Sequence, residues 1–196
     1  FSLDRVSKSG AKFDYEKGKW FNHEYMQMHD DGEVAGMFMP ILKEHGINVD
    51  NDSADDHDFQ TSSFGLQYVV KVCGMMKERI NFISEMWETT SYFFTAPTEY
   101  DPAAIKKRWK PGMTTHMGKV IEILNTVPFE YDAIHKALLD EYILGNQLNM
   151  GQVMNSLRLA VVGKTVGPDM LTLVMTIGKE ETIRRVQKAI EVIGEQ

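Results

Sequence analysis

The chain has 196 residues, of which 43% are hydrophobic and 10% aromatic, enough apolar material for a packed core. Its formal net charge of -7 argues against a protein that binds nucleic acid by overall charge, because such affinity comes from lysine and arginine at phosphates. The sequence has no apolar run long enough to span a bilayer and no secretory signal at its start. We therefore expect a soluble cytoplasmic protein without a membrane partner.

Positive charge is concentrated in three places along the chain. Any nucleic-acid function must therefore use a localised face, although the simplest interpretation of all three groups is solvated helix surface. The groups lie near the start, in the middle and near the end: Arg5, Lys8, Lys12, Lys17 and Lys19; Lys106, Lys107, Arg108 and Lys110; Arg184, Arg185 and Lys188.

An acidic run at 50–58 reads DNDSADDHD and could be taken for a calcium loop. It lacks the glycine at the sixth position and the glutamate at the twelfth that close such a loop. The six histidines are scattered, and none has the spacing of paired metal ligands. We expect a solvated loop between helices here, and no metal site in the chain.

The single cysteine, Cys73, has no partner for an internal disulfide or a CxxC zinc site. It falls on one helical stripe with four apolar residues, which predicts a core position. The stripe consists of Val69, Val72, Cys73, Met76 and Ile80.

Helical periodicity dominates the ordered segments, and no segment shows sustained strand alternation. The pattern predicts an all-α fold of helix-bundle or helix-cage type, without a sheet of three or more strands. Because a helix seldom runs through a proline and its preceding residue, Pro128 is the predicted boundary between two helical subdomains, 1–127 and 128–196.

The segment 149–171 combines features suited to an unstacked nucleotide. Arg158 lies at the edge of a predicted buried stripe, where its guanidinium can reach a base or a phosphate. The loop 163–167 permits close backbone approach, and Pro168 fixes the turn into the next helix, whose free N–H groups suit oxygen ligands. The alternative is that Arg158 is a surface charge and Gly167-Pro168 only a helix break.

Three ordered segments resemble the tRNA-binding end of bacterial glutamyl-tRNA synthetases. In chain order they read LDRVSKSGAKFDYEKGKWFNHEY (3–25), KERINFISEMWETTSYFF (77–94) and GQVMNSLRLAVVGKTVGPDMLTLVMTIGKEETIRR (151–185). None of them is a catalytic motif, and the HIGH-type adenylate motif is absent. Lys8 and Ser9 match the Arg-Val-Ser-Lys-Ser run that follows the catalytic signature in these enzymes.

The resemblance implies a helical region that recognises the anticodon of tRNA(Glu), with no catalytic or metal-binding residue of its own. We interpret the chain as the C-terminal part of a longer monomeric glutamate-tRNA ligase, whose missing N-terminal catalytic domain uses ATP and Mg. Two departures are Leu171, where the family usually has phenylalanine, and Gly18, where it usually has leucine. The positions that match the family's anticodon contacts are Arg79, Arg158, Gly167, Pro168, Met170 and Leu171.

Two alternatives remain open at this point. Arg79 could form an ion pair with Glu85 instead of reading a base. The whole chain could be an all-helical scaffold whose acidic surface binds a protein partner. A contiguous positive face containing Arg79, Arg158 and the loop near Gly167 would distinguish tRNA binding from a scaffold.

Overall fold

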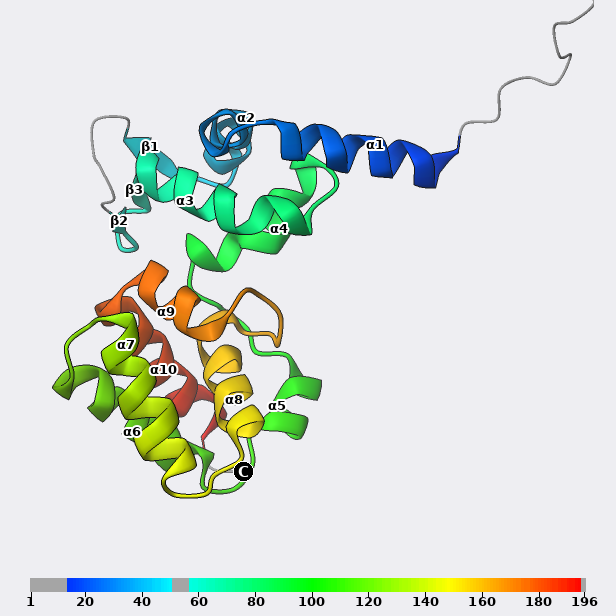
Figure 1. The fold of residues 1–196 in the computed structure, drawn as a ribbon. Helices are drawn as coiled ribbons and strands as arrows, with labels where there is room; N and C mark the ends of the chain where they lie inside the picture. Colours follow the sequence, from blue (N-terminus) through cyan, green and yellow to red (C-terminus); the bar gives the residue numbers. More distant parts are fainter. Residues whose placement is uncertain (1–13, 51–56, 195–196) are drawn as a thin grey trace, which may run out of the picture.

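The computed structural model describes residues 14–50 and 57–194, and the helices over these ranges form two groups (Figure 1). We call residues 14–50 and 57–94 the first lobe and residues 102–194 the second lobe. The segment 95–101 joins them. Of the basic group at the start of the sequence, Arg5, Lys8 and Lys12 lie outside the described residues, as does the middle of the acidic run, 51–56.

The first lobe starts with a helix that makes few contacts, α1 (Tyr15–Met28), followed by α2 (Asp31–Glu44). Asp30 caps α2, and its side chain and that of Glu33 each accept a backbone N–H of the other residue in a capping box. Helix α2 packs on α3 (Leu66–Met76). The rest of the lobe consists of the 3₁₀ turns η2 (Lys77–Arg79), η3 (Ile83–Glu85) and η4 (Ser91–Phe93), with α4 (Met86–Thr90) between η3 and η4.

A small sheet is formed by strands that come after α2 and before α3 in the chain. Its strands are β1 (Asn48–Asp50), β2 (His57–Asp58) and β3 (Ser63–Gly65), in the order β1-β3-β2. Strand β3 pairs parallel with β1 and antiparallel with β2. The all-α class is confirmed because helices make up nearly all of the ordered structure, but the prediction that no three-stranded sheet occurs is wrong. Strands of two or three residues are too short to show a side-chain alternation.

The second lobe is entirely helical within its described residues. Helix α8 (Met150–Val162) packs against α10 (Lys179–Ile193), α6 (Met113–Thr126) and α5 (Pro102–Arg108), while α9 (Met170–Ile177) lies on the side of the first lobe (Figure 1). Helix α7 (Tyr131–Ile134) continues into a π-helix, η5 (His135–Leu144). None of the described helices is long and apolar enough to cross a membrane.

The contacts between helices of the second lobe bear on the predicted boundary between subdomains at Pro128. Helices on both sides of Pro128, α6 before it and α8 and α10 after it, are packed against one another. We therefore propose that the two structural units meet in 95–101 rather than at Pro128. The predicted core stripe through Cys73 is confirmed, since all five of its side chains are at most 2% exposed.

Candidate nucleic-acid interface

Arg158 occupies the edge of α8 that the sequence predicts. Val153, Leu157 and Val161 on the same helix are buried, whereas Arg158 is half-buried. Its Nη1 atom is buried and has no hydrogen-bond partner among the described residues. Burial lowers the pKa of Arg158, and the nearby Asp169 carboxylate opposes this effect. The guanidinium therefore has one buried donor without a partner among the described residues.

Gly167 brings arginines from the two lobes together. Arg79, exposed at the end of η2, donates from Nη1 to the Gly167 carbonyl oxygen at 3.3 Å. Arg158 is near the same glycine, since a Cβ added to Gly167 would lie 3.0 Å from Arg158 Nη1. Gly167 has a φ of 129°, in the region that favours glycine. The described residues contain no ion pair between Arg79 and Glu85, whose carboxylate instead accepts the backbone N–H groups of Asn81 and Phe82.

Tyr92 is a further member of this cluster that the sequence does not single out. A Cβ on Gly167 would lie 3.3 Å from its hydroxyl, which donates weakly to the Met76 sulfur at 3.9 Å. Burial raises the pKa of Tyr92 to about 12, although the charges of Arg79 and Arg158 oppose the rise. The hydroxyl is therefore neutral at physiological pH. We define the Gly167 cluster as Arg79, Tyr92, Arg158 and Gly167.

The remaining three predicted site residues are placed differently. Pro168 is buried, and Met170 and Leu171 are each 2% exposed, so their side chains belong to the core. The N-terminus of α9 is also less available than expected. Asp169 caps it, accepting the backbone N–H of Thr172 at 2.9 Å, and its carboxylate places negative charge where an anion would bind. Arg79 is thus exposed and Arg158 and Gly167 are partly exposed, whereas the side chains of Met170 and Leu171 are buried.

A family model described as an anticodon binding domain matches residues 33–190. The chain belongs to this family. Similar proteins include glutamate–tRNA ligases of Phocaeicola vulgatus, 44% identical over 98% of this chain, and Parabacteroides distasonis, 43% identical over 98%. The chain covers 35% of each, so it spans about a third of the length of the curated relatives it matches.

Solved structures similar to this anticodon binding domain are also glutamate-tRNA ligases. The glutamate tRNA ligase from Elizabethkingia meningosepticum, in complex with its amino acid, superposes with a TM-score of 0.80 at 35% identity. The match covers 98% of this chain and 35% of that one. The glutamate-tRNA synthetase from Elizabethkingia anophelis has a TM-score of 0.76 at 34% identity, covering 97% of this chain and 34% of that one.

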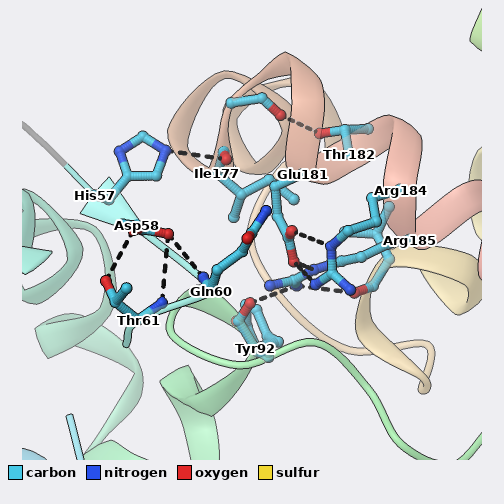
Figure 2. A network of polar contacts seen from close by, with 12 residues as sticks. His57, Asp58, Gln60, Thr61, Tyr92, Ile177, Glu181, Thr182, Arg184 and Arg185 are labelled. Carbon is cyan, nitrogen blue, oxygen red and sulfur yellow. Dashed lines mark hydrogen bonds and ion pairs between the residues drawn. The ribbon is translucent and has the colours of Figure 1, made fainter. Parts of the chain in front are cut away.

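A network of ion pairs and hydrogen bonds joins α10 of the anticodon binding domain to Tyr92 of the Gly167 cluster (Figure 2). Glu181 on α10 accepts from Arg185 Nε at 2.5 Å and from Arg184 Nε at 2.7 Å. Arg185 is only 1% exposed, so the interpretation of its basic group as solvated surface is wrong for this residue. Its Nη1 donates to the carbonyl oxygens of Tyr92 at 2.6 Å and Val161 at 3.1 Å. Arg185 therefore fastens the turn that carries Tyr92 to the helix that carries Arg158.

Proposed function

We propose that this chain recognises the anticodon of tRNA(Glu), as the anticodon-binding part of a glutamate–tRNA ligase. One observation carries the proposal: Arg79 from the first lobe and Arg158 from the second both lie beside Gly167. A protein scaffold has no need to bring two cations with 78 residues between them to one glycine. A reader of single-stranded nucleotides does need donors at a place where the backbone can be approached closely.

The chemistry of the Gly167 cluster suits an unstacked base. A guanidinium donates through a planar fork that matches the acceptors on a base edge or a phosphate. Arg158 keeps a buried donor without a partner, and such a donor gains most from a ligand that supplies an acceptor. The Tyr92 hydroxyl adds a neutral group that can donate or accept. We infer that the two arginines hold one nucleotide between the lobes.

The same proposal covers the intact protein. It would be a monomeric cytoplasmic ligase that joins glutamate to tRNA(Glu) with ATP and Mg. Among the residues described, no group of three or more His, Cys, Asp or Glu side chains could hold a metal ion. We propose that the chemistry belongs to another part of the protein, because this chain spans about a third of the length of its ligase relatives, and we assign it recognition.

Titration of the 196-residue chain with tRNA(Glu), and with a copy altered only in its anticodon, tests the proposal. Arg158→Ala should weaken binding of the correct tRNA by about 1–3 kcal/mol and reduce the preference for the correct anticodon. Lys107→Ala is the control, because it removes one exposed positive charge on α5. If Arg158 meets only a phosphate, affinity should fall equally for both anticodons. If Arg158→Ala and Lys107→Ala behave alike, the assignment of base reading to Arg158 fails.

A further inference from the structure

A second basic cavity lies apart from the Gly167 cluster, between the segment 95–101 and α10. It has a volume of about 450 Å³, and its charged lining residues are all cationic: Arg184, Arg185 and Lys188. Thr98 and Tyr100 contribute hydroxyl groups to the same lining. A cavity of this volume is large enough for a small organic molecule rather than a bare ion.

The charges around this cavity are unbalanced. Glu181 is the one carboxylate that pairs with Arg184 and Arg185 among the described residues, and it serves both of them. Lys188 is exposed and forms no ion pair within the described residues. Three cations against one carboxylate leave a formal charge of +2. A dianion would balance this charge, whereas a single carboxylate would leave half of it.

Two residues that line the cavity carry a buried donor without a hydrogen-bond partner within the described residues. They are Tyr100, 9% exposed, through its hydroxyl, and Arg185, 1% exposed, through Nη2. Buried polar groups are nearly always hydrogen-bonded, so the Tyr100 hydroxyl is a candidate to meet an acceptor in the cavity, whereas the Arg185 guanidinium lies against the Phe59 ring, 5.0 Å from its centroid. Burial raises the pKa of Tyr100, which keeps its hydroxyl protonated and able to donate.

We propose that this cavity binds the phosphate group of a nucleotide-sized molecule, with Lys188, Arg184 and the Tyr100 hydroxyl as its donors. A phosphate monoester carries the two negative charges and the several acceptor oxygens that these groups require. A free nucleotide supplies both charges on one phosphate, whereas an RNA backbone supplies one charge on each phosphodiester, so two neighbouring backbone phosphates would be needed to balance the site. The site and the Gly167 cluster share no side chain, although Arg185, which lines the cavity, also donates to the Tyr92 carbonyl oxygen.

Calorimetric titration of the full chain with adenosine 5′-monophosphate tests the proposal, with adenosine as the phosphate-free comparison. We expect saturable binding of the monophosphate only, weakened at least tenfold by Lys188→Gln and also weakened by Tyr100→Phe. Lys107→Gln, which removes an exposed charge on α5, should leave it unchanged. Circular dichroism confirms that each variant is folded. Arg158→Ala should not alter this binding, which separates it from anticodon recognition.

A single-stranded uridine pentanucleotide distinguishes the two sources of phosphate. If the pentanucleotide binds and the monophosphate does not, and Lys188→Gln weakens that binding while Lys107→Gln does not, the site holds an RNA backbone phosphate. The proposal is overturned if neither probe binds saturably, or if Lys188→Gln and Lys107→Gln have the same effect.

Discussion

Neutralising Glu181 should strongly destabilise the protein. This carboxylate is 7% exposed and accepts three hydrogen bonds, one from Arg185 and two from Arg184. Glu181→Gln keeps the shape of the side chain but removes its charge. Arg185, 1% exposed, would then be a buried cation without a counter-ion.

The expected magnitude follows from that burial. Removing one partner of a buried ion pair costs about 3–5 kcal/mol, because the other charge remains desolvated. Total stabilities are about 5–15 kcal/mol, so the loss is a large fraction of what holds the fold. In a chain of this length each kcal/mol of lost stability lowers the midpoint temperature of thermal unfolding by about 2–4 °C. The predicted decrease in that temperature is therefore roughly 6–20 °C.

Urea unfolding followed by circular dichroism measures the effect. Arg184→Gln is the matched control, because it removes a charge from the same network at a side chain that is 54% exposed. Exposed pairs contribute about 0–1 kcal/mol, so the control should change stability little. A Glu181→Gln loss below about 1 kcal/mol would refute the reasoning, since it would mean that Arg185 is solvated or paired elsewhere.

Three further outcomes follow from the structure. Gly163→Ala should cost about 1–3 kcal/mol in urea unfolding, because φ is 80° and its Cβ would lie 2.6 Å from the Glu99 carbonyl oxygen. Gly167→Ala should weaken tRNA binding in the titration above, since its Cβ would displace the guanidinium of Arg158. An unchanged affinity would contradict that placement. Burial raises the pKa of Cys73 to about 12, so iodoacetamide at pH 8 should modify it only after unfolding. Because the thiol must stay protonated in the folded protein, its contribution to the free energy of unfolding is complete below its pKa in the unfolded chain, about 8.5. That contribution is lost as the pH rises towards 12. Rapid alkylation of the native protein would contradict this prediction.

The local pattern of apolar residues in the sequence was sufficient to predict the helices and part of the candidate site. The stripe through Cys73 and the stripe on α8 are periodic over two to three turns, so each predicts a buried face without knowledge of its partner. Arg158 and Gly167 are nine residues apart, and a helix end followed by a short loop keeps them close. Their proximity was therefore predictable from the sequence.

The rest depends on contacts between distant residues. Arg185 donates to the carbonyl oxygen of Tyr92, 93 residues earlier in the chain, and nothing in its own helix distinguishes it from the neighbouring Arg184. The burial of Met170 and Leu171 likewise depends on how α9 packs against α8 and the first lobe. The strands are too short to show an alternation of apolar and polar side chains in the sequence. In addition, β1 pairs with β3, which lies beyond the acidic run.

Polar contacts between the lobes explain how the Gly167 cluster can keep a defined shape. The contacts join Arg79 to Gly167, Arg185 to Tyr92, and His57 to the Ile177 carbonyl oxygen at 3.1 Å. Hydrogen bonds are directional, so three of them between the lobes restrict rotation more than apolar contact of the same area would. Because Arg79 and Arg158 belong to different lobes, that restriction also fixes the separation of their guanidinium groups. Preorganised donors lose less entropy when a ligand binds. Under the proposed reading of the anticodon, the buried Arg185 would contribute to recognition without touching the anticodon, since it holds the backbone of Tyr92, whose hydroxyl lies beside Gly167.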